Sequence, residues 1–248
     1  MRSRKANSGT AQRPSRVLVL DVGGTHVKMR IGTRGAVREF ASGRKLRARE
    51  MVAGVLEQTV DWRYDAVAIG YPGLVFHGRI AAEPHNLGGG WVGFDFSKAF
   101  GKPVRIVNDA AMQAMGSYAG GRMLFLGLGT GLGATLIMDG IVEPMEIGHM
   151  PFKHGRTFEN YVGERGCRRL GPKKWRKVVG EVVRQLATVL EVDYVVLGGG
   201  NTRKLKTLPK HVRRGDNRNA FAGGLRLWEQ NEADMLVLGA RARARGGR

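Results

Sequence analysis

Two glycine-rich turns in the sequence could hold an anion against bare backbone. They lie in LVLDVGGTHVKMRI, which begins at Leu18, and in LFLGLGTGLGATLI, which begins at Leu124. Because glycine has no Cβ, the amide groups of such a turn can approach a phosphate closely. A tight hairpin without a ligand would explain either turn alone, but two related turns that each contain a threonine favour phosphate. The residues assigned to phosphate here are Asp21, Gly23, Gly24, Thr25, Lys28, Gly129, Thr130 and Gly131.

The second turn does not fit two common nucleotide motifs. GLGTGLG lacks the GK[ST] ending of a P-loop. Residues 129–134 have the spacing G-x-G-x-x-A, but a dinucleotide fingerprint opens a helix, whereas the ATLIM that follows is typical of a strand.

Two aspartates stand where a rigid element would present a carboxylate. Asp109 follows the apolar run VRIV and begins a predicted helix, which suits a general base; either Asn108 or Asp109 could instead cap that helix. Asp21 flanks the first glycine turn and could hold Mg²⁺ through water, or could simply stabilise the turn. Lys28, on an alternating strand, either faces the same site or is merely exposed.

Hydrophobic periodicity predicts the elements that position these residues. Residues 17–21 and 26–31 form a predicted hairpin, and the second glycine stretch repeats this pattern 106 positions later and ends in an Asp139-Gly140 turn. Further strands are predicted at residues 66–70, 104–107 and 194–197, and helices at residues 50–60, 109 to about 118, 172–190 and 220–230.

Positive charge is concentrated in one internal segment. The 248 residues carry 41 Lys and Arg against 21 Asp and Glu, a net charge of +20. Residues 165–218 hold 15 basic and 4 acidic side chains, and both termini are basic. Such a segment is either a solvated face or the binding surface of a polyanion.

The composition predicts a cytoplasmic protein. No apolar run approaches the roughly 18 residues that a membrane helix needs, and no apolar stretch follows the basic amino terminus to make a signal peptide. Cys167 is the single cysteine, so no internal disulfide and no cysteine cluster for zinc can form.

Several motifs together resemble a known family. DVGGT, GLGTGLG and GGGN are similar to the three phosphate and nucleotide motifs of the sugar kinase, Hsp70 and actin superfamily. Within it, NDA at Asn108, EIGH at Glu146 and FENYVG at Phe158 resemble the ROK sugar kinases. PHNLGGGWVGFDF, RMLFLGLGTGLG and VVLGGGN, with the short length, are most similar to the polyphosphate glucokinases and glucomannokinases of that family.

The resemblance covers the chain from Val17 to about Glu229 and implies a fold. It implies two α/β domains of the sugar kinase and actin type, which is ribonuclease H-like, with the active site in the cleft between them. The smaller domain would span residues 17–108 and the larger one residues 109–236, and the last helix could pack back on the smaller domain. Residues 1–16 and 237–248 would be disordered basic tails.

The resemblance also assigns roles to individual residues. It makes Asp109 the catalytic base for a sugar hydroxyl and adds a third donor-binding turn. The implied sugar-binding residues are Asn86, Asn108, Asp109, Glu146, His149 and Glu159, and the third turn contributes Gly198, Gly199, Gly200 and Asn201. Many ROK proteins carry a cysteine-rich zinc motif between the residues matching His149 and Glu159, but here the interval reads MPFKHGRTF, so no structural zinc is expected.

The basic segment bears on the phosphoryl donor. A long polyphosphate needs a charged track, whereas ATP needs only a pocket, so the charge favours polyphosphate, with ATP as a second donor. The track residues are Lys173, Lys174, Lys177, Arg203, Lys204 and Lys206. The expected reaction is Mg²⁺-assisted phosphorylation of glucose or mannose by a chain that could form a homodimer. Two alternatives stay open: an ATP-only kinase for an amino sugar, and a non-catalytic protein of this fold that binds nucleic acid.

Overall fold

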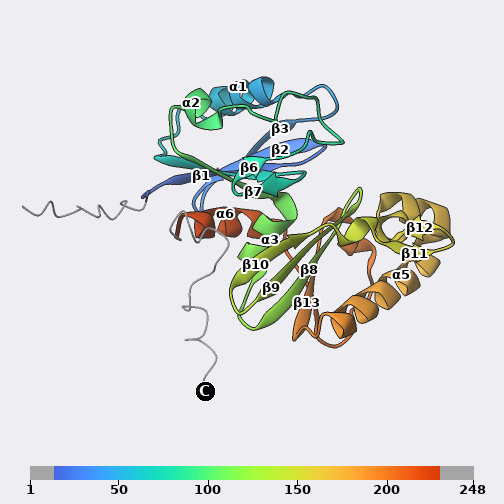
Figure 1. Cartoon of the computed structure of the whole chain (residues 1–248). Coiled ribbons are helices and arrows are strands. Elements are labelled where there is room, and N and C mark those ends of the chain that lie inside the picture. Colours follow the sequence, from blue (N-terminus) through green and yellow to red (C-terminus); the bar gives the residue numbers. More distant parts are fainter. Residues whose placement is uncertain (1–13, 230–248) are drawn as a thin grey trace, which may run out of the picture.

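The computed structural model describes residues 14–229 (Figure 1). The predicted tails lie outside the described residues, apart from residues 14–16. The Ser15 hydroxyl and the Arg16 backbone N–H donate to the Asp65 carboxylate at 2.6 and 3.0 Å. Ser15 and Arg16 therefore belong to the fold rather than to a tail. Within residues 14–229, no helix is both long and apolar enough to cross a membrane.

The first half of the chain is built on a five-stranded sheet in the order β3-β2-β1-β4-β7. Its strands are β1 (Val17–Val22), β2 (His26–Ile31), β3 (Arg38–Ala41), β4 (Ala66–Tyr71) and β7 (Val104–Asn108). The outer face is covered by α1 (Ala48–Gln58) and α2 (Phe96–Phe100), and a small hairpin of β5 (Val75–Phe76) and β6 (Arg79–Ile80) lies in the connection between β4 and α2. The predicted hairpin of β1 and β2 is confirmed.

The second half repeats this plan with the order β10-β9-β8-β13-β14. Its strands are β8 (Arg122–Leu128), β9 (Leu132–Met138), β10 (Ile141–Met145), β13 (Tyr194–Gly198) and β14 (Val212–Arg214). In each sheet three antiparallel strands come first and two parallel strands follow. The predicted duplication is therefore confirmed at the level of strand order.

Two helices form a layer between the sheets (Figure 1). α3 (Asp109–Ser117) and α6 (Asn219–Glu229) share one apolar core with Val19 of the first sheet and Phe125 of the second. The helices cross in backbone contact, since a Cβ on Gly223 would lie 1.7 Å from the Met112 carbonyl oxygen. α6 also contacts β1 and β4. Because this layer belongs to both halves, the division into domains at residue 108 stays a prediction.

The outer face of the second sheet is covered by the long basic helix, which begins earlier than predicted. α5 (Glu164–Val189) contains Gly171 at φ 71° and ψ 160°, followed by Pro172. The part after Gly171 matches the predicted helix, because proline is favoured at the first position of a helix. The part before it, RGCRRL, was missed because it is too short and too basic to show an apolar period. Trp175 on α5 packs against the sheet.

Candidate active site

The two candidate carboxylates lie at the carboxyl ends of neighbouring parallel strands. Asp21 of β1 pairs with Gly70 of β4, and Gly70 pairs with Val107 of β7, which is two residues before Asp109. A Cβ on Gly70 would lie 3.5 Å from the Cα of Asp109 and 2.3 Å from the Met112 methyl group. Because Gly70 has no side chain, α3 can begin close to the sheet. This position places Asp109 near Asp21.

Asn108, and not Asp109, caps α3. Its Oδ1 accepts hydrogen bonds from the backbone N–H groups of Ala110 and Ala111 at 2.9 and 3.2 Å. Its Nδ2 donates to the Gly73 carbonyl at 3.0 Å, so much of this predicted sugar ligand is engaged in structure. Asp109 is the first residue of the helix, with one carboxylate oxygen 2.7 Å from the Ala110 nitrogen. Since the capping role falls to Asn108, the carboxylate of Asp109 is not needed for it.

Burial and neighbouring charge tune both carboxyl groups. Burial, together with the negative charges of Asp21 and Glu146, raises the pKa of Asp109 to about 7, against the opposing effect of the Ala110 N–H. Burial also raises the pKa of Asp21 to about 6, opposed by the charge of Lys28. Lys28 is the cross-strand neighbour of Asp21, and its Nζ lies 4.0 Å from the Glu39 carboxylate. Lys28 therefore has two partners within the first half.

The second half supplies the other predicted sugar residues. Glu146 precedes the short 3₁₀ helix η1 (Ile147–His149), and its Oε2 lies 3.9 Å from Nδ1 of His149. Both side chains are more than half exposed, at 58% and 62%. The following interval is a hairpin of β11 (Pro151–Lys153) and β12 (Arg156–Thr157), which leads into α4 (Phe158–Val162) with Glu159 in its first turn.

The position of the Glu159 side chain accounts for the glycine at position 131 in the second glycine loop. A Cβ on Gly131 would lie 2.2 Å from Oε2 of Glu159, which also accepts from the Leu132 N–H at 3.4 Å. Gly131 is thus required by the close approach of a side chain, whether or not it also faces a phosphate. This contact joins a predicted sugar residue directly to the predicted phosphate loop.

Side chains that are distant in sequence also contact the first glycine loop. A Cβ on Gly24 would lie 3.2 Å from the Cβ of Asn86, so this predicted sugar residue packs on the glycine turn. Ser42, after β3, donates through its hydroxyl to the Gly23 carbonyl at 2.6 Å and through its N–H to the Thr25 carbonyl at 2.8 Å. Ser42 was missed because no motif marks a serine that holds a distant turn. Thr25 itself is exposed.

The third glycine turn is hydrogen-bonded to the second. Asn201, in the 3₁₀ helix η2 (Gly200–Lys204), is only 6% exposed and donates through Nδ2 to the Gly129 carbonyl at 2.8 Å. Its amide therefore joins two loops, and the binding of the donor by Asn201 stays a prediction. The N–H of Glu164 at the start of α5 bonds to the carbonyls of Gly129 and Thr130 at 3.1 and 3.2 Å.

Packing explains some loop glycines and not others. A Cβ on Gly198 would lie 2.3 Å from the Phe125 ring, and one on Gly199 would lie 2.5 Å from the Leu128 carbonyl oxygen. In contrast, a Cβ on Gly129 or Gly200 would meet no described atom within 4 Å. These two positions therefore leave space for a ligand where the second and third turns meet; Gly200 is exposed, whereas Gly129 is half-buried and its N–H donates to the Gly131 carbonyl at 3.2 Å.

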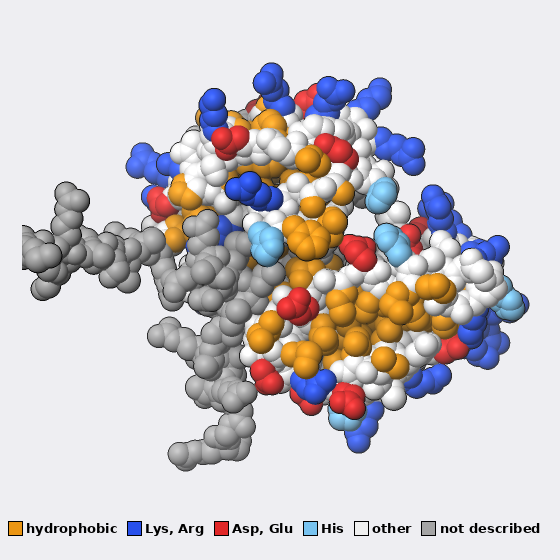
Figure 2. Space-filling view, in the orientation of Figure 1, with side chains coloured by type: hydrophobic (Ala, Val, Ile, Leu, Met, Phe, Trp, Pro, Cys, Tyr) orange, Lys and Arg blue, Asp and Glu red, His pale blue; other side chains and the backbone are white. Residues whose placement is uncertain are grey.

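The predicted track residues lie on α5 and in the segment around η2. Lys173, Lys174, Lys177, Arg203 and Lys206 are exposed. Lys204 pairs with Glu164 at 3.0 Å, which neutralises part of its charge. Lys177 lines a cavity of about 360 Å³ with Leu205 and Leu208, so the helix and the segment after η2 border one groove. Figure 2 shows Lys and Arg side chains along the outer margins of both halves.

A model of the ROK family matches residues 17–169. The chain belongs to the ROK family. It is 28% identical to a polyphosphate glucokinase of Mycobacterium tuberculosis over 162 residues, which cover 58% of each protein. It is 30% identical to a kanosamine kinase of Amycolatopsis mediterranei over 174 residues, which cover 60% of this chain and 56% of that kinase. These matches span less than two thirds of the length of either relative.

Solved structures confirm the predicted fold. The inorganic polyphosphate/ATP-glucomannokinase of Arthrobacter sp. strain KM superposes with a TM-score of 0.74 at 20% identity, over 86% of this chain and 98% of that one. A ROK family glucokinase of Streptomyces griseus, in complex with glucose and AMPPNP, gives 0.66 at 17% identity, over 88% of this chain and 100% of that one. The chain thus has the two-part α/β fold of the actin-like sugar kinases.

Proposed function

We propose that the protein is a sugar kinase that transfers the terminal phosphoryl group of inorganic polyphosphate, with ATP as a second donor, to the 6-hydroxyl of glucose or mannose. The observation that carries this proposal is the placement of Asp109. Its carboxylate stands at the start of α3, free of the capping role, beside Asp21 of one half and within the field of Glu146 of the other. A non-catalytic protein would have no need of such a group.

In the proposed reaction Asp109 takes the proton of the sugar hydroxyl. The hydroxyl oxygen forms a bond to the terminal phosphorus as the phosphoanhydride bond breaks, and the donor leaves one phosphate shorter. A base works best with a pKa near the working pH, and burial raises the pKa of Asp109 to about 7. Glu146, His149 and Glu159 would bind the other hydroxyls, so that a sugar lacking one leaves polar groups unpaired.

Mg²⁺ fits the carboxylate of Asp21. Carboxylates are the ligands that this ion prefers, and Asp21 ends β1 close to a second negative charge at Asp109. When bound, the ion would offset the charge of the transferring phosphoryl group. The carboxylate of Asp21 would hold it, directly or through water.

The donor would lie in the open space next to Gly129 and Gly200. A Cβ at either position would meet open space, and Arg203 of η2 and Lys206 after it follow Gly200 closely in the chain. A polyphosphate chain leaving this point would meet the exposed Lys177, which lines the groove between α5 and residues 205–209 together with Arg176. The charge therefore supports polyphosphate, and Lys204 stays in the proposed track with part of its charge offset by Glu164.

One relative supports a second candidate. The kanosamine kinase match, at 30% identity, favours an ATP-dependent kinase for an amino sugar. In that case the acidic side chains of Glu146 and Glu159 would face an ammonium group of the sugar. The two candidates share Asp109 as the base and differ in donor and acceptor.

The deciding experiment measures sugar phosphate formed with Mg²⁺ and either long-chain polyphosphate or ATP, for glucose, mannose and an amino sugar. Each assay is repeated with Asp109→Asn and with Glu57→Gln, an exposed control on α1. Polyphosphate-driven turnover of glucose or mannose that is lost only in Asp109→Asn supports the proposal. Turnover confined to ATP and the amino sugar supports the second candidate, and no turnover with any pair would refute both.

A further inference from the structure

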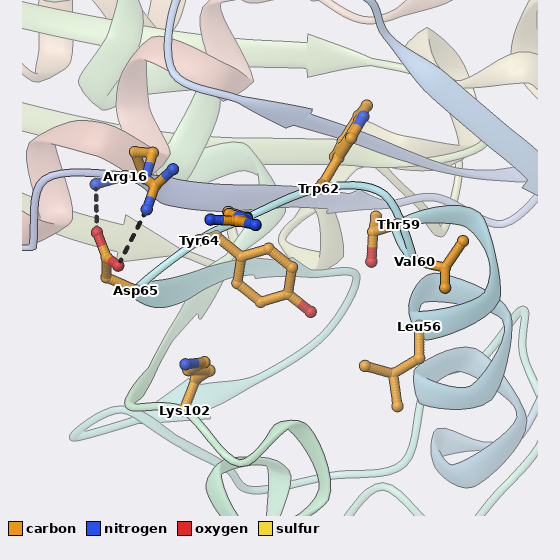
Figure 3. Close-up of a pocket in the computed structure, with 9 residues that line it drawn as sticks. Arg16, Leu56, Thr59, Val60, Trp62, Tyr64, Asp65 and Lys102 are labelled. Atoms are coloured by element: carbon orange, nitrogen blue, oxygen red, sulfur yellow. Dashed lines mark hydrogen bonds and ion pairs between the residues drawn. The ribbon is translucent and has the colours of Figure 1, made fainter.

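A hollow of about 480 Å³ lies at the edge of the first sheet opposite the candidate active site (Figure 3). It is formed by Arg16 before β1, the segment between α1 and β4, and Lys102 before β7. Because β1, β4 and β7 are parallel, this edge carries their amino ends, whereas Asp21 and Asp109 stand at their carboxyl ends. Its volume is within the range of small-molecule sites.

One side of the hollow offers an aromatic face with apolar neighbours. Figure 3 shows the ring of Tyr64 between Lys102 and the side chains of Leu56 and Val60, while Trp62 points away. Val60 is 87% exposed and Leu56 is 40% exposed, so both present apolar surface to solvent at this rim. A flat apolar group could stack on Tyr64 and cover both side chains.

The other side of the hollow is cationic. Asp65 is engaged by Ser15 and by Arg16, whose guanidinium lies 3.9 Å from its carboxylate. Arg63 and Lys102 form no ion pair with any residue between 14 and 229. The lining thus has three basic side chains against one carboxylate, which favours an anion.

We propose that this hollow binds a nucleoside phosphate, with the base stacked on Tyr64 and the phosphate at Arg63 and Lys102. Inorganic polyphosphate has no apolar part that would cover Leu56 and Val60. A sugar phosphate would place hydroxyl groups against the same apolar wall and leave them unpaired. An aromatic base joined to a phosphate satisfies both sides, as in single-strand nucleic acid sites that combine stacking with basic residues.

The ligand could be a free nucleotide or one unit of a single-stranded nucleic acid. A longer strand brings more phosphates to Arg16, Arg63 and Lys102 than a mononucleotide does, and would therefore bind more tightly. The two sources share one recognition chemistry and differ in this added affinity.

The test is calorimetric titration of the full chain with AMP, ribose 5-phosphate and a six-residue oligoadenylate. AMP is expected to bind, and Tyr64→Leu is expected to weaken it by at least about fivefold, the lower end for stacking of one base. Tyr64→Phe keeps the aromatic ring and should bind AMP with wild-type affinity. Arg63→Gln, an exposed substitution that does not threaten the fold, should weaken AMP and ribose 5-phosphate alike. Tighter binding of the oligoadenylate than of AMP would identify a single-stranded nucleic acid as the ligand. Equal affinity for the two would identify a free nucleotide.

A matched control removes the same kind of charge elsewhere. Lys173→Gln with Lys177→Gln, on α5, should leave AMP binding in this hollow within twofold and should impair only the use of polyphosphate. The proposal is overturned if AMP does not bind, if ribose 5-phosphate binds as tightly as AMP, or if Tyr64→Leu and Arg63→Gln leave AMP affinity unchanged. The last result would place any AMP bound at the donor loops instead.

Discussion

Replacing Asp109 with asparagine should stabilise the protein at high pH while removing turnover. The pKa of this carboxyl is about 7 in the fold against 3.8 when free. Keeping it ionised at pH 8 therefore costs about 4 kcal/mol relative to the unfolded chain. Because the side chain is only partly buried, we discount this for solvent screening to about 2 kcal/mol. Asparagine keeps the shape and carries no charge.

The sign of the pH dependence follows from the raised pKa. Between about pH 4 and 7 the folded state binds the Asp109 proton more tightly than the unfolded state, so this group contributes stability at low pH that is lost as pH rises. The advantage of Asp109→Asn should thus be largest at pH 8 and less than half as large at pH 5. About 2 kcal/mol corresponds to about 4–8 °C in melting temperature for a chain of this size.

The assay compares thermal unfolding of wild type, Asp109→Asn and the exposed control Glu57→Gln at both pH values, without Mg²⁺ or substrate. Turnover of Asp109→Asn should fall on the order of 10²-fold or more at pH 8. A variant that melts no higher than wild type at pH 8, or whose advantage does not shrink at pH 5, would show that the carboxyl is not desolvated. Full activity would remove Asp109 from the mechanism.

Three further variants test other contacts. Gly131→Ala places a methyl group 2.2 Å from the Glu159 carboxylate, so KM for the sugar should rise by about tenfold or more; an unchanged KM would separate this contact from sugar binding. Gly223→Ala places one 1.7 Å from a backbone oxygen of α3 and should lower the free energy of unfolding in urea by about 3 kcal/mol; wild-type stability would contradict the close helix crossing. Lys173→Gln with Lys177→Gln should raise KM for polyphosphate several-fold and leave KM for ATP within twofold; equal effects on both donors would refute the proposed track.

Local signals in the sequence were enough for most of the strands and turns. The Asp139-Gly140 turn has positive φ at both residues, 51° and 96°, as a two-residue hairpin turn of this composition requires. The hairpins around the two glycine loops follow from alternating apolar residues a few positions apart. Asp109 could be found because a buried strand leads straight into a helix start.

Contacts between distant segments could not be predicted in this way. Asn201 and Gly129 are 72 positions apart and Glu159 and Leu132 are 27 apart, and nothing local indicates that they meet. The sequence alone also does not distinguish glycines that have different structural roles. Gly131 is required by the Glu159 side chain, whereas Gly129 faces open space, and only the fold separates the two cases.

The proposed base, Asp109, stands where the two halves of the molecule meet. Asp21 belongs to the first sheet, whereas Glu146, Glu159 and Gly129 belong to the second half. Asp109 begins α3, which follows β7 of the first sheet and packs in the core shared by both halves. Glu146 is more than half exposed, so a sugar held between the halves would complete its contacts only as they approach. Any such approach about α3 would bring hydroxyl and phosphate ligands toward Asp109 while Asp21 stays beside it, which ties proton removal to the exclusion of water.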